Sequence, residues 1–168
     1  MRVLRGGERI VRLFGELAAA LTVVLVFVTV VDVLLRYLFR AGSVAVQEAE
    51  WHLFGLVVLL GVAETLRRDE HVRVDIIYAR LAPAKQGLID LLGSLLFLIP
   101  FAVVGIWTSA SFAARAYRFG ERSVDPGGLP FRFLIKGAIT LGFLLLLLEG
   151  LAFAWRAFER ARGKDTGQ

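Results

Sequence analysis

The stretch LAAALTVVLVFVTVV, residues 17–31, decides the fold, because it holds fifteen consecutive residues without a charge. It belongs to an apolar run from Leu13 to Leu35. A bilayer core of ~30 Å needs about 20 helical residues at ~1.5 Å each, so this run predicts a transmembrane helix. Bulky and charged residues follow it where a cleaved signal peptide needs small ones, which predicts an uncleaved signal anchor.

Three further apolar runs follow, over residues 50–66, 88–114 and 131–155. Hydrophobic residues make up 57% of the chain, whereas soluble domains usually hold roughly 45–50%. The third run contains Pro100, whose ring removes a backbone hydrogen bond and predicts a kink. We therefore predict an all-α integral membrane protein that forms a single membrane domain over residues 1–168, with four transmembrane helices at about 13–35, 50–66, 88–114 and 131–155.

The lysines and arginines predict how these helices are oriented. If the N-terminus is cytoplasmic, thirteen of the twenty basic residues fall in cytoplasmic segments and seven fall outside. The positive-inside rule therefore favours both termini in the cytoplasm. The net charge of +5 comes from basic residues that flank apolar runs, so it indicates membrane topology and no nucleic-acid partner. The outer set is Arg36, Arg40, Arg115, Arg118, Arg122, Arg132 and Lys136.

The connection between the second and third helices, ETLRRDEHVRVDIIYARL, covers residues 64–81 and is rich in charges. Its carboxylates and His71 could suggest a metal site or an acid–base pair. The carboxylates lie next to arginines, however, and His71 lacks a second ligand of the metal-binding type at a useful spacing. Over residues 73–85, apolar and charged residues partly alternate, which predicts a short amphipathic segment at the cytoplasmic interface.

The sequence offers no catalytic or cofactor motif. It contains no HExxH, GxSxG or P-loop pattern and no cysteine, which excludes disulfides and thiolate metal sites. Haem ligation is disfavoured because the two histidines, His52 and His71, would lie roughly 28 Å apart along one helix. We expect no enzymatic activity, no metal and no cofactor in this chain.

Glu149 is the most unusual single residue, because it follows five leucines within the fourth apolar run. Ionisable groups inside a membrane cost ~2.5–3.5 kcal/mol and usually face a partner. Glu149 could serve as a coupling-ion or proton site. Alternatively, it makes a buried polar contact with a neighbouring helix or reaches the nearby interface. Glu64 is the carboxylate closest to its depth, and Arg67 or Arg68 could neutralise Glu64 within its own helix.

Other charged residues have simpler interpretations. Asp32 and Arg36 have the i,i+4 spacing of an intrahelical ion pair. Glu48 and Glu50 are expected to open the second helix, where carboxylates suit the positive end of the helix dipole. A role in partner binding is the alternative, although capping is sufficient to explain one of them. The outer loop, residues 120–136, contains the turn signal Asp125-Pro126-Gly127-Gly128 and then Pro130 next to the start of the fourth helix. This loop is either a tight turn or a docking surface.

Taken together, these features resemble the small membrane subunit, DctQ type, of tripartite ATP-independent periplasmic (TRAP) transporters. The resemblance extends over nearly the whole chain. It rests on the four-helix topology, the outer loop GERSVDPGGLPFRFLIK and a series of signature residues in the family's order: Glu48, Gly61, Arg67, Arg68, His71, Val74 and Asp75. Glu149 departs from it, because the family is expected to have an uncharged residue at that position.

The resemblance implies a function and partners. The small subunit would pair with a much larger permease subunit, to which an extracytoplasmic solute-binding protein delivers an organic acid or related solute. It would act as a scaffold in the bacterial inner membrane. The complex would use a sodium gradient that this subunit does not bind. Two alternatives remain open: a stand-alone proton-coupled transporter that uses Glu149, and a membrane enzyme or cytochrome subunit, which the missing motifs disfavour.

Overall fold

The computed structural model describes residues 2–68, 78 and 80–163, and within them it contains helices and no strand. Four segments are long and apolar enough to cross a membrane, as the sequence predicts. In chain order the elements are α1 (Arg2–Phe39), α2 (Val44–Arg67), α4 (Pro83–Gly93), the π-helix η1 (Ser94–Leu98), α5 (Ile99–Arg118) and α6 (Phe133–Ala161).

Each helix is longer than the apolar run that predicts it. Helix α1 begins at Arg2 instead of Leu13, and α6 continues past Trp155 to Ala161. Hydropathy marks only the part of a helix that matches the hydrocarbon. The backbone hydrogen bonds of a helix are satisfied internally in lipid and in water alike, so polar residues extend it on both sides.

The third span is one continuous path through α4, η1 and α5. Pro83 occupies the first turn of α4, and Pro100 occupies the first turn of α5, directly after the π-helix. Pro100 cannot donate a backbone hydrogen bond, and the wider π turn before it accommodates that loss. Part of the predicted amphipathic segment, residues 73–77 and 79, lies outside the described residues.

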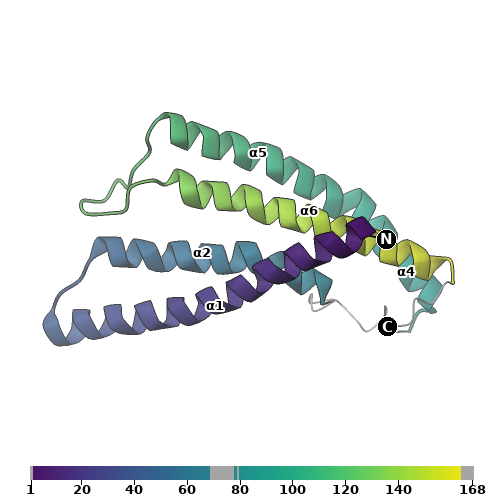
Figure 1. Ribbon diagram of the computed structural model, residues 1–168, viewed down its shortest axis with the longest axis horizontal. Helices are drawn as coiled ribbons and strands as arrows, with labels where there is room; N and C mark the ends of the chain where they lie inside the picture. The colour runs from purple at the N-terminus through teal and green to yellow at the C-terminus, as the bar shows by residue number, and fades with distance from the viewer. Residues whose placement is uncertain (1, 69–77, 79, 164–168) are drawn as a thin grey trace.

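The four spans follow one another across an open layer in the order α1, α2, α6 and α5 (Figure 1). The layer is doubled where α1 crosses over α6, and there Val11, Ala63 and Leu145 share one buried core. Helix α1 packs along α2 and crosses α6 only near its own start. Among the described residues, α5 packs extensively on α6 and has no comparable contact with α1 or α2. We call the end with the α1–α2 and α5–α6 connections the loop end, and the opposite one the terminus end. An open layer of this kind leaves two broad faces that the rest of the described chain does not cover.

Close contacts through glycine hold neighbouring helices together. A Cβ atom at Gly142 of α6 would lie 2.9 Å from the carbonyl oxygen of Leu59 on α2, and one at Gly105 of α5 would overlap the ring of Phe143. A Cβ at Gly87 of α4 would lie 2.6 Å from the backbone nitrogen of Ala161. Small residues let helices approach in a membrane, where packing replaces the hydrophobic effect. Here Gly105 and Gly142 serve contacts within the chain.

Candidate functional site

At the loop end, Glu48 holds the long connection between α5 and α6. One carboxylate oxygen accepts hydrogen bonds from the Ser123 hydroxyl and, at 3.1 Å, from the Arg132 guanidinium. The other oxygen accepts one from the backbone N–H of Leu129 at 2.5 Å. Glu48 is buried. Its partners lie 75 to 84 residues away in the chain, so this carboxylate joins α2 to the loop between α5 and α6.

This geometry corrects the expected role of Glu48. Helix α2 begins at Val44, and its first turn contains no acidic residue. Glu48 and Glu50 therefore lie inside the helix and do not open it. Glu48 instead caps a backbone N–H of the loop, and its own carbonyl accepts a hydrogen bond from Nδ1 of His52 at 2.5 Å.

The positions of Gly127 and Gly128, in the loop between α5 and α6, favour glycine for different physical reasons. Gly127 has a φ of +82°, a left-handed conformation that favours glycine. Gly128 lacks a positive φ, but a Cβ there would overlap Ser123 and lie 2.9 Å from Oε2 of Glu48. Pro130 is exposed just ahead of α6. Both glycines thus shape the loop so that it can close on Glu48.

At the terminus end, Glu64 binds the two signature arginines. Its carboxylate accepts hydrogen bonds at 2.7 Å from Arg67, through both Nε and Nη2, and at 2.7 Å from Nε of Arg68. The predicted neutralisation within α2 is confirmed. The aliphatic part of Glu64 packs on α1, where a Cβ at Gly15 would lie 2.5 Å from its Cγ.

Glu149 is fully buried in α6. One of its oxygens accepts a hydrogen bond at 2.5 Å from Arg156, two turns later on the same helix. Arg156 also donates to Glu8 of α1 at 2.6 Å. The second oxygen of Glu149 has no hydrogen-bond partner within the described part of the chain. The result is a chain of three charges that joins α1 to α6.

A third polar contact secures α4 at the same end. The Tyr78 hydroxyl donates to Oδ2 of Asp90 at 2.7 Å, and Arg160 of α6 donates to the same oxygen at 3.1 Å. Gln86 donates to the Tyr78 carbonyl at 3.0 Å. These bonds tie the end of the connection between α2 and α4 to α4 and α6.

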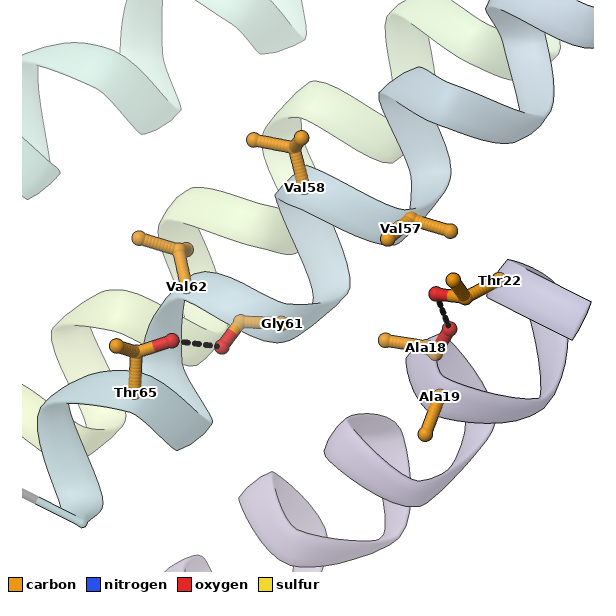
Figure 2. Close-up of a pocket in the computed structure, with 8 residues that line it drawn as sticks. All are labelled: Ala18, Ala19, Thr22, Val57, Val58, Gly61, Val62 and Thr65. Carbon is orange, nitrogen blue, oxygen red and sulfur yellow. Dashed lines mark hydrogen bonds between the residues drawn. The ribbon is translucent and has the colours of Figure 1, made fainter. Parts of the chain in front are cut away.

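Gly61 lines a groove of about 400 Å³ between α1 and α2 (Figure 2). The Thr65 hydroxyl donates to the Gly61 carbonyl and the Thr22 hydroxyl donates to the Ala18 carbonyl, both at 3.0 Å. Each hydroxyl is therefore used by its own helix, and the groove is chiefly apolar. A Cβ at Gly61 would meet only Ala18, at 3.8 Å.

The remaining predicted residues divide into two groups. Asp32 and Arg36 form the expected ion pair at 2.8 Å. His71 and Asp75, together with Val74, lie outside the described residues. Among the residues that are described, no three His, Asp or Glu side chains come together as a metal site.

Comparison with known proteins now places the chain. The family model described as tripartite ATP-independent periplasmic transporters, DctQ component, matches residues 25–160. The chain belongs to the DctQ family. It is also similar to a Haemophilus influenzae protein named "Putative TRAP transporter small permease protein", with 28% identity over 137 residues, which cover 80% of this chain and 82% of that protein.

Membership in the DctQ family establishes the broad role. The chain is the small membrane component of a tripartite transporter and not an enzyme. Its four apolar helices agree with a multi-pass protein of the inner membrane.

Sequence reasoning missed several partners in the two charge clusters, which are Glu48 with Ser123, Leu129 and Arg132, and Glu149 with Arg156 and Glu8. Arg156 lies seven residues after Glu149, which puts both on one helix face, and that spacing could have revealed the pair. Glu8, Ser123 and Arg132 carry no such signal, because their contacts depend on how α1 and the outer loop fold back.

Proposed function

We propose that this DctQ subunit is the scaffold of its transporter and braces a large permease subunit in the inner membrane. That permease would take up an organic acid or related solute, delivered by an extracytoplasmic binding protein and driven by a sodium gradient. The small subunit itself would bind neither the solute nor sodium.

One observation carries this proposal: the buried carboxylates of the described spans are committed to arginines of the same chain. Glu64 is paired with Arg67 and Arg68, and Glu149 is paired with Arg156. A transport pathway needs polar groups that can exchange partners with a solute or ion. The pairs support a fixed structural element, and the open layer of helices supports a wall against which a larger partner can pack.

One oxygen of Glu149 has no hydrogen-bond partner among the described residues, and this observation favours the alternative, a proton-coupled role for this residue. Glu149→Gln tests both ideas in the complete transporter, reconstituted in vesicles with its binding protein. Scaffolding predicts sodium-dependent uptake close to that of the unchanged protein and a normal yield of the assembled complex. Normal assembly with abolished uptake would contradict the scaffold proposal.

A matched control separates the loss of charge from general damage. Glu16→Gln removes an exposed carboxylate from α1 that, within the described residues, pairs with Arg12 alone, at 2.9 Å. It should therefore change neither assembly nor uptake. Uptake by the small subunit alone, without the large permease, would also contradict the proposal.

A further inference from the structure

Helix α5 presents an unusual surface on the side turned away from the layer. Its buried residues, Ala102, Gly105, Ser109 and Ala116, all face α6. At 3.6 residues per turn, an arc of about 80° on the opposite side holds Trp107, Ser111, Arg115 and Arg118. An outward face near the loop end therefore carries an indole, a hydroxyl and two guanidinium groups.

The gap between these side chains is shallow and open. A depression of about 310 Å³ is lined by Trp107, Thr108, Ser111 and Arg115. Trp107 is 76% exposed, and Arg115 and Arg118 are exposed as well. From Trp107 to Arg115 the helix rises by about 12 Å, comparable to the distance from the upper acyl chain to the headgroup of a lipid.

The arginines of this face differ from three of the other basic residues at the loop end, although Arg40 and Arg122 also lack an ion pair among the described residues. Arg36, Arg132 and Lys136 are paired with Asp32, Glu48 and Glu121 respectively. Within the described residues, neither Arg115 nor Arg118 forms an ion pair. A guanidinium at the edge of the hydrocarbon needs a counter-charge or water, and its fork of donors can bind a phosphate through two hydrogen bonds.

We infer that this face of α5 is a binding site for an anionic phospholipid. The phosphate binds Arg115 and Arg118, and one acyl chain descends over Ser111 beside the Trp107 ring. Charge complementarity and the apolar lower half together select a lipid, because a free anion would gain nothing from the indole. The exposed Tyr117 and Phe119 next to the arginines suit the same interfacial depth.

The site can be tested on the purified full-length subunit in detergent by native mass spectrometry, with phosphatidylglycerol and phosphatidylcholine as probes. Each arginine near a membrane surface changes binding about fivefold, so Arg115→Gln should weaken phosphatidylglycerol binding by about that factor and Arg115→Gln/Arg118→Gln by about 25-fold. Phosphatidylcholine binding should change little. Trp107→Leu should weaken both lipids, because the indole contacts the acyl chain of either.

Arg40→Gln is the matched control, because Arg40 is also exposed at the loop end and also lacks an ion pair among the described residues. It should leave binding unchanged, and all variants should keep the unfolding temperature of the unchanged protein. Equal affinity of that protein for the two lipids would overturn the inference, as would an Arg40→Gln effect as large as that of Arg115→Gln. Two further results would do the same: displacement of the lipid by millimolar inorganic phosphate, or arginine variants that lose only binding to the solute-binding protein.

Discussion

Each end of the helical layer contains a buried carboxylate, and the two carboxylates are paired in different ways. At the loop end, Glu48 uses both carboxylate oxygens and accepts from a hydroxyl, a guanidinium and a backbone N–H. At the terminus end, Glu149 uses one oxygen and reaches α1 only through Arg156. A loop has free backbone donors that a carboxylate can cap, whereas two helices have none, so an arginine must bridge them.

This difference predicts how much stability each end should lose when one of its charged residues is replaced. Loss of Glu48 leaves partners that are neutral or partly exposed to solvent. Loss of Arg156 leaves a fully buried carboxylate without a counter-charge. The terminus end is therefore expected to be the more fragile of the two.

The largest effect is expected for Arg156→Ala. Removing one partner of a buried ion pair costs on the order of 3–5 kcal/mol, because the remaining charge stays desolvated. Thermal unfolding in detergent should show a strongly lowered midpoint. Arg156→Ala/Glu149→Gln should recover most of the loss, since it neutralises the stranded carboxylate. An Arg156→Ala protein as stable as the unchanged one would show that the network contributes nothing.

At the loop end, Glu48→Gln should cost less, about 1.5–3 kcal/mol, the usual range for hydrogen bonds to a charged group. The amide keeps one acceptor oxygen but must turn its NH₂ toward donors. Limited proteolysis of the 120–132 loop, followed together with thermal unfolding, would measure the loss. Glu50→Gln on the same helix is the control, because Oε1 of Glu50 has no partner among the described residues. Equal effects of the two substitutions would remove the special role of Glu48.

Gly128→Ala tests the same cluster from the loop side. The added methyl would overlap Ser123 and crowd Oε2 of Glu48, so about 1–2 kcal/mol of stability should be lost through overpacking, measured by thermal unfolding. Gly120→Ala is less suitable as a control because Gly120 has a φ of +57°. Gly137→Ala is better, since its Cβ would meet nothing within 4 Å. A Gly128→Ala variant whose loop closes normally, with unchanged stability, would contradict the close approach described here.

The comparison also shows what sequence could predict. The four spans follow from apolar runs, and the pairs Asp32–Arg36 and Glu64–Arg67 follow from helical spacing, because each depends on residues close in the chain. Local periodicity says nothing about which helix lies beside which. The open layer, the Glu8–Arg156 bond and the loop contacts of Glu48 therefore came only from the structure.

Glu48 illustrates the limit most clearly. A carboxylate near the start of a helix is reasonably expected to favour the helix dipole. That expectation failed because α2 begins four residues earlier, at Val44, and because the loop supplies stronger, charge-assisted partners.

The smallest effect is expected at Gly61, which lies about one turn before Glu64 in α2. A methyl group there would meet only Ala18 at an ordinary contact distance, and its φ is not in the left-handed region. Alanine is favoured over glycine inside a helix by roughly 0.5–1 kcal/mol, so Gly61→Ala should leave the subunit unchanged or slightly more stable in thermal unfolding. Gly142→Ala is the matched control and should be destabilising, because its Cβ would press on the Leu59 carbonyl. If both alanines destabilised the subunit equally, the α1–α2 groove would have to be tighter than this structure has it. If only Gly142→Ala did, the charge clusters at the two ends and the glycine contact between α2 and α6 would hold the layer together without help from Gly61.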